Sequence, residues 1–158
     1  MSNRSSGILL HPTSLPETPG IGTIGKQAYK FVDWLASAKQ TLWQILPIGP
    51  TGYGDSPYAS FSTFAGNPLM IDLDMLKENG WISAEQIAPP DYIKSSGYVD
   101  FGSVVWWKIP VLKTAASQFL DSCKKEDRDA CTVEALHPND LGFYRIAQVI
   151  YEVVKELV

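Results

Sequence analysis

Two short apolar runs with a helix pattern between them constrain the fold of this chain more than any other feature. The first run is GILL at 7–10, and the second is WQIL at 43–46. Between them, apolar residues recur at helical spacing over 26–39. A strand, a helix and a strand in this order make a βαβ unit, whose strands lie parallel with a right-handed crossover. The sequence therefore predicts an α/β fold in which the first strand is buried on both faces.

The loops that follow the two predicted strands are the expected place for a binding site. They span 11–25 and 47–68 and are rich in proline and glycine. Parallel α/β proteins bind ligands at the carboxyl ends of their strands, and both loops begin there. His11 opens the first loop, where a role in the site and a plain hydrogen bond at the strand end fit the sequence equally well.

The second loop carries the stretch GYGDSPYASFSTFAGNP at 52–68, which combines aromatic rings with hydrogen-bonding groups. The rings belong to Tyr53, Tyr58, Phe61 and Phe64, and the polar groups include Asp55, Ser56 and Asn67. A sugar offers C–H bonds on its faces and hydroxyls at its rim, so this mixture suits a sugar. The lack of Lys and Arg in the stretch argues against a phosphate ligand. Composition alone favours a plainer alternative, a turn-rich loop whose aromatics pack inward and whose Asp55 binds backbone N–H groups.

Composition and charge exclude several classes of protein. The chain has 158 residues, of which 45% are apolar and 19% charged, as in a globular domain with a real core. A net charge of −4 gives no basic surface for nucleic acid. No stretch approaches the roughly 20 apolar residues that a membrane span needs, and the first apolar run is too short for a signal-peptide core. We therefore expect a cytoplasmic protein with neither nucleic acid nor membrane as a partner.

The few cysteines and histidines predict neither a disulfide framework nor a metal site. Cys123 and Cys131 fit no zinc spacing, and we expect free thiols in a reducing compartment. The two histidines, His11 and His137, are too few and too isolated to hold a metal. We interpret His137 as part of the lead-in to a helix.

After Pro68 the pattern changes to a series of helical signals. Asp72 or Asp74 is expected to cap a short helix that ends at Gly80. The stretch 83–86 has capping-box spacing, and 104–120 reads as a helix in which Pro110 sits in the first turn or causes a kink. Asp140 is expected to cap a last helix.

Chemistry at a glycosidic bond would need a second carboxyl group beside Asp55. Such reactions use a pair, one as acid and one as nucleophile or base. The candidates near the strand ends are Asp55 and Asp72, and Asp72 reads better as a helix cap. The sequence therefore offers groups that hold a sugar but no complete catalytic apparatus.

Several stretches together resemble the start of the 4-α-glucanotransferases, also called amylomaltases or disproportionating enzymes and related to the α-amylase clan. They are SSGILLHPTSLP at 5–16, WQILPIGPTGYGDSPY at 43–58, SFS at 60–62 and FAGNP at 64–68, with YVDF at 98–101 and WK at 107–108 as looser matches. The resemblance covers roughly the first 110–120 residues. The tail after Phe119 does not resemble the family.

The resemblance implies the N-terminal part of a (β/α)8 TIM barrel with an inserted, mainly helical subdomain. A complete barrel needs about 200–250 residues, so the barrel is incomplete in this chain. We expect the first βαβ unit and substrate loop at 1–68, the inserted subdomain at 69–120 and a helical tail at 121–158. The family needs no cofactor and transfers α-1,4-glucan segments with retention of configuration, and its catalytic carboxylates come from later strands that lie beyond this chain.

The resemblance also implies roles for residues of the second loop. The position of Tyr58 stacks on the sugar beside the scissile bond, Asp55 and Ser56 line the same cleft, and Tyr53 belongs to a second glucan-binding patch. The expected partners are an α-1,4-glucan and the remainder of the barrel, and the isolated chain is expected to be inactive. Two alternatives stay open, a non-catalytic glucan-binding module and an inert fragment.

Overall fold

The computed structural model describes residues 4–16, 18–62, 64–93 and 98–122, together with 132–133 and 137–138. The chain forms two compact units, Met1–Thr114 and Ala115–Val158. In the first unit lie β1 (Gly7–Leu9), α1 (Lys26–Ser37), β2 (Leu42–Gln44), α2 (Leu73–Glu78) and three short 3-10 helices, Pro12–Ser14, Tyr53–Asp55 and Pro68–Met70. The helix α3 (Phe101–Ser122) begins in this unit and continues into the second.

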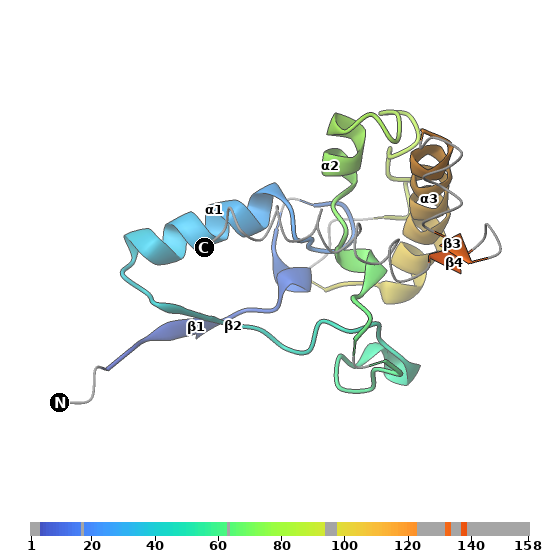
Figure 1. Cartoon of the computed structure of the whole chain (residues 1–158). Coiled ribbons are helices and arrows are strands. Elements are labelled where there is room, and N and C mark those ends of the chain that lie inside the picture. The colour runs from blue at the N-terminus through green and yellow to red at the C-terminus, as the bar shows by residue number, and fades with distance from the viewer. Residues whose placement is uncertain are drawn as a thin grey trace. The chain divides into compact units, whose positions relative to one another are not determined.

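The predicted βαβ unit is present. β1 pairs in parallel with β2 (Figure 1), and Gly7 lies opposite Leu42. A Cβ atom on Gly7 would lie 2.4 Å from the carbonyl oxygen of Leu42, so this close pairing requires glycine. The second strand begins one residue earlier than the apolar run predicted and ends at Gln44. The helix between the strands ends at Ser37, shortly before Lys39 adopts a positive φ of 57°.

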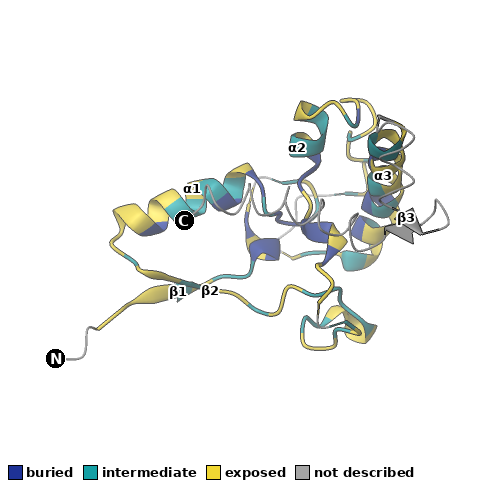
Figure 2. Cartoon of the chain, viewed as in Figure 1, coloured by how far each residue is buried: buried dark blue, intermediate teal, exposed yellow. Residues whose placement is uncertain are grey.

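The prediction that the first strand is buried on both faces is wrong for the described residues. Leu9 and Leu42 are 57% and 55% exposed, and the strand pair is mostly exposed in Figure 2. The helix α1 packs on the pair through Phe31, whose ring meets that of Trp43 edge-on at 5.0 Å. Parallel sheets are normally covered on both faces, and the local pattern of apolar residues does not reveal whether a second cover is present.

The core of the first unit lies away from the strands. Ile21, Leu69 and Val104 form its buried centre, and Ile93, Val99, Phe101 and Ile109 pack against them. This core joins the first loop, the segment that follows the second loop, and α3. The three-part division at 68 and 120 that the sequence suggested stays a prediction.

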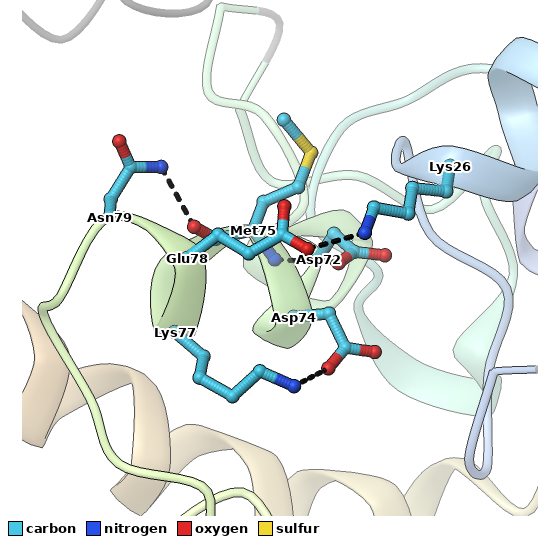
Figure 3. Close-up of polar contacts among 7 residues, drawn as sticks. All are labelled: Lys26, Asp72, Asp74, Met75, Lys77, Glu78 and Asn79. Carbon is cyan, nitrogen blue, oxygen red and sulfur yellow. Dashed lines mark hydrogen bonds and ion pairs between the residues drawn. The ribbon is translucent and has the colours of Figure 1, made fainter.

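The capping predictions for the short helix α2 are confirmed. Asp72 occupies the N-cap, and its carboxylate accepts a hydrogen bond from the Met75 amide at 3.0 Å (Figure 3). Beyond the other end, Gly80 has a positive φ of 76°. The stretch 83–86 makes the reciprocal bonds of a capping box but forms only a turn, with Gln86 Oε1 accepting from the Ser83 amide at 2.8 Å.

The predicted long helix is also present and begins earlier than expected. α3 starts at Phe101, where Asp100 accepts hydrogen bonds from the Ser103 amide and hydroxyl at 3.2 and 2.8 Å. Pro110 therefore lies in the helix interior and not in its first turn. No helix in the described part of the chain is long and apolar enough to cross a bilayer.

Little of the second unit is described beyond the end of α3. β3 (Thr132–Val133) and β4 (His137–Pro138) pair in antiparallel fashion, so His137 lies in a strand. The helix predicted from Asp140 and the two cysteines, Cys123 and Cys131, fall outside the described residues.

Candidate functional site

A cavity of about 180 Å³ lies where the two predicted loops meet. Its lining comes from both loops and from the first residue of α3, namely His11, Thr13, Ser14, Leu46, Pro47, Gly49, Thr51, Asp55, Pro57, Asn67 and Phe101. The two loops leave the carboxyl ends of β1 and β2. The structure thus brings together the segments that the βαβ pattern pointed to, at the end of the sheet where parallel α/β proteins bind ligands.

The predicted site residues divide into two groups. His11, Asp55 and Asn67 line the cavity. Tyr53, Ser56 and Tyr58 do not line it, and of these Tyr53 and Tyr58 are exposed while Ser56 is half-buried. The cavity therefore holds part of the predicted set, and the aromatic residues form a neighbouring exposed surface.

His11 precedes the 3-10 helix Pro12–Ser14 and is partly buried. Burial lowers the pKa of its imidazole below the ordinary value, which favours the neutral ring. Its Nδ1 atom is buried and has no hydrogen-bond partner among the described residues. A neutral imidazole has one donor and one acceptor nitrogen, and a ligand hydroxyl can serve either.

Asp55 is held in an uncommon backbone conformation. Its φ is 55°, and Gly54 before it has a φ of 74°, so two successive residues lie in the left-handed region. Such a conformation in a residue with a side chain costs on the order of 1–3 kcal/mol and often occurs at functional sites. The turn leaves the Asp55 carboxylate exposed at the edge of the cavity.

The aromatic rings of the loop point outward, against the plainer alternative considered from composition. Tyr58 is 72% exposed, Phe61 79% and Phe64 98%, while Tyr53 is fully exposed. Beside Tyr58, the Ser56 hydroxyl accepts a hydrogen bond from the Tyr58 amide at 3.3 Å. The loop therefore presents flat apolar faces to its surroundings, as a sugar-binding surface does and an inward-packed turn does not.

Asn67 has a structural function that the sequence did not indicate. Its side chain is buried, and its Oδ1 accepts from the Leu69 amide at 3.0 Å, which caps the 3-10 helix Pro68–Met70. Its own amide donates to the Ile48 carbonyl at 2.8 Å. These bonds fix the end of the loop, and the side-chain NH2 group is what Asn67 can offer to a ligand.

Some residues of the cavity were not predicted as site residues. Thr13 and Ser14 follow His11 in the first loop, so the position of that loop was the signal that could have found them. Phe101 comes from α3, and only the tertiary packing of that helix places it here.

The fold and cavity define an α/β protein in which the loops after two parallel strands line a cavity, and comparison with known proteins gives its family. The family model described as 4-alpha-glucanotransferase matches residues 10–135. The match therefore extends past Phe119, where we expected the resemblance to end. The chain belongs to the 4-alpha-glucanotransferase family. It is 48% identical over 127 residues to a 4-alpha-glucanotransferase of Thermus thermophilus and 46% identical over 121 residues to one of Streptococcus pneumoniae.

These similarities cover most of this chain but a minor part of its relatives. The matches span 80% and 77% of this chain and 24% of each of the two relatives. A solved structure, the amylomaltase from Streptococcus agalactiae in complex with acarbose, matches with a TM-score of 0.71 and 44% identity over 76% of this chain and 24% of the amylomaltase. The chain thus corresponds to about a quarter of the proteins that it resembles.

Proposed function

We propose that this chain is the N-terminal part of a 4-α-glucanotransferase and supplies contacts to the α-1,4-glucan. The observation that carries the proposal is the exposed aromatic surface of the second loop beside a cavity lined by His11 and Asp55. Tyr58 stacks on a sugar ring, Asp55 and Ser56 bind hydroxyls of the same glucan, and Tyr53 contacts glucan outside the cleft. In the full protein, the segment transferred goes to the 4-hydroxyl of glucose or of another glucan.

The size of the cavity supports a site that this chain shares with the rest of a longer protein. Pockets for small ligands usually measure about 300–1,000 Å³, and this cavity measures about 180 Å³. The exposed faces of Leu9 and Leu42 indicate a second surface that further chain would cover. We therefore propose that β1 and β2 are the first strands of a (β/α)8 barrel, and that the remainder of the barrel brings the catalytic carboxylates.

A non-catalytic glucan-binding module remains the alternative. The same aromatic surface favours it, because stacking on a sugar requires no carboxylate pair. The two proposals differ in how tightly the isolated chain binds glucan. A module binds tightly alone, whereas a part of a larger cleft binds weakly because its facing wall is missing. The cytoplasmic location predicted from the sequence stays a prediction under either proposal.

The role of Tyr58 can be tested by affinity electrophoresis of the chain through gels that contain soluble amylose. Amylose should retard the native chain weakly. The Tyr58→Ala variant should show an affinity about tenfold lower, which corresponds to about 1.4 kcal/mol. Tyr92→Ala is the matched control, because Tyr92 is 54% exposed and lies outside the loop.

Two results would count against the proposal. Equal retardation of the Tyr58→Ala and Tyr92→Ala variants would contradict the proposal that Tyr58 stacks on a sugar ring. Strong retardation of the native chain, reaching micromolar affinity and lost in Tyr58→Ala, would instead favour the self-sufficient binding module.

A further inference from the structure

Lys108 is the most deeply buried charged side chain in the described part of the protein. It is 2% exposed, and its Nζ donates a hydrogen bond to the Leu69 carbonyl oxygen at 2.7 Å. A cavity of about 40 Å³ lies against Lys108 and is also lined by Asp72 and Thr23. A buried ammonium group is costly, so the hydrogen bond that Lys108 makes to a backbone carbonyl in the core calls for an explanation.

The carbonyl that Lys108 binds belongs to the segment where the aromatic loop rejoins the body of the protein. We call residues 67–70 the loop root. Within it, the Met70 amide donates to the Asn67 carbonyl at 3.1 Å, and the Met70 carbonyl accepts from the Ile24 amide at 2.9 Å. Asn67, which lines the larger cavity, is two residues from the carbonyl that Lys108 holds.

One face of α3 contacts both the larger cavity and the loop root. Phe101, Val104 and Lys108 are separated by three and four residues, so they lie on the same side of the helix. Phe101 lines the larger cavity, Val104 packs on Leu69 in the core, and Lys108 binds the Leu69 carbonyl. One helix face therefore contributes to the site and also holds the loop root beside it.

We propose that Lys108 is a positioning residue that fixes the loop root, and through Asn67 fixes the aromatic loop against the cavity. The proposal extends the proposed function, because its consequence for glucan binding holds only if the loop binds glucan. The anchoring itself does not depend on any ligand. A lysine suits the task because its long stem crosses the core while its head donates to one chosen carbonyl.

Asp72 completes the arrangement from the other side of the small cavity. Its carboxylate accepts from the Thr23 hydroxyl at 2.6 Å and from the Met75 amide at 3.0 Å, so its position is fixed by two elements. It also favours the charged form of Lys108. The loop root is thus tied to α3 through Lys108, while Asp72, which follows it closely, is tied to the first loop and to α2.

Amide hydrogen exchange in Lys108→Met, read at single residues by NMR, tests the anchoring. Methionine keeps the apolar stem but cannot donate, so the Leu69 carbonyl is left buried and unpaired, a state that local opening relieves. We expect protection of the Asn67, Leu69 and Met70 amides to fall about tenfold or more, with Leu35 in α1 unchanged. Lys113→Met is the matched control, because Lys113 is exposed on the same helix.

Unchanged protection at the loop root in Lys108→Met would overturn the proposal, and so would an equal fall at Leu35, which indicates general destabilisation. If Lys108→Met does not fold, the native protein labelled with ¹⁵N-lysine decides. A slowly exchanging ammonium resonance of Lys108 with nuclear Overhauser contacts to Leu69 supports anchoring, and a freely exchanging one refutes it.

The glucan arm of the experiment separates this proposal from the proposed function. Retardation by amylose should weaken in Lys108→Met in parallel with loop-root protection, and should stay native in Lys113→Met. A loss of protection without any change in retardation would support the anchoring of the loop root by Lys108 and refute its role in glucan binding. Absence of retardation in every protein, the native one included, would count against the proposed function. The exchange experiment would then still test whether Lys108 anchors the loop root.

Discussion

Two opposing electrostatic effects act on the pKa of Lys108. Burial lowers the pKa of its ammonium from 10.5 to about 8, and the carboxylate of Asp72 offsets part of that effect. The pKa is lower in the folded chain than in the unfolded chain, where the side chain is hydrated. The proton on Lys108 therefore opposes folding, and its loss favours the folded state.

This difference predicts an unusual pH dependence of stability. Between pH 8 and pH 10.5 the unfolded chain binds more protons at this residue than the folded chain does, so the contribution of Lys108 to stability rises with pH. The rise amounts to about 3 kcal/mol over that window. Urea unfolding of the native chain and of Lys108→Met at several pH values measures it, because the other titrating groups are common to both proteins.

The free energies of unfolding of the two proteins should diverge steadily above pH 8 in favour of the native chain. At pH 7 the difference between the two proteins should be smallest, because the native chain then has the full cost of a charged ammonium group in its core. Parallel pH profiles for the two proteins would show that Lys108 has an ordinary pKa and is hydrated.

Among the elements, α2 depends most clearly on one residue. Asp72 caps the helix, accepts a hydrogen bond from the Thr23 hydroxyl and favours the charged form of Lys108. Asp72→Ala should therefore destabilise the first unit by about 3 kcal/mol. Asp72→Asn keeps a capping oxygen but loses the charge, so its loss should be smaller. Urea unfolding monitored by circular dichroism provides the measurement.

The neighbouring Asp74 gives the control for that prediction. Its carboxylate makes an exposed ion pair with Lys77 in the same helix (Figure 3), so Asp74→Ala should cost less than about 0.5 kcal/mol. A loss of equal size in Asp72→Ala and Asp74→Ala would mean that net charge near the helix start matters, and not the specific contacts of Asp72.

The elements also show what could be predicted from the sequence. The helices over 26–37 and 101–122 were found because apolar spacing along a helix is local information. The cap at Asp72 was found for the same reason, since the bonded amide is three residues away. The exposure of Leu9 could not be found, because it depends on what covers the sheet and not on the strand itself.

The candidate site was predictable in position but not in composition. The βαβ pattern placed the loops of His11 and Asp55 together, whereas the outward direction of the aromatic rings and the contribution of Phe101 depend on tertiary packing. The burial of Lys108 could not be predicted from the sequence either, because a lysine in a helix pattern is normally solvated. The roles of Tyr58 and Ser56 came from resemblance to the family and stay proposals.

Across the described part of the chain, several large apolar residues are exposed in the strands and in the second loop. Leu9 and Leu42 of the strand pair and Phe61 and Phe64 of the loop are all more than half exposed. Relatives that match this chain are about three times as long, because 127 and 121 matched residues make up 24% of each. Under the proposed function, further barrel strands cover the sheet and a facing wall of the cleft meets the loop, so each exposed surface has an occupant.

The central claim is that the loop beside His11 binds an α-1,4-glucan, and chemical-shift mapping of the native chain tests it most directly. Addition of maltotriose should shift the amide signals of His11, Asp55 and Tyr58 in fast exchange, as expected for weak binding to one wall of a cleft. Cellotriose, in which the glucose units are joined by β-1,4 bonds instead of α-1,4 bonds, should leave these signals unshifted. Static signals at these three residues, or equal shifts with both sugars, would contradict the account.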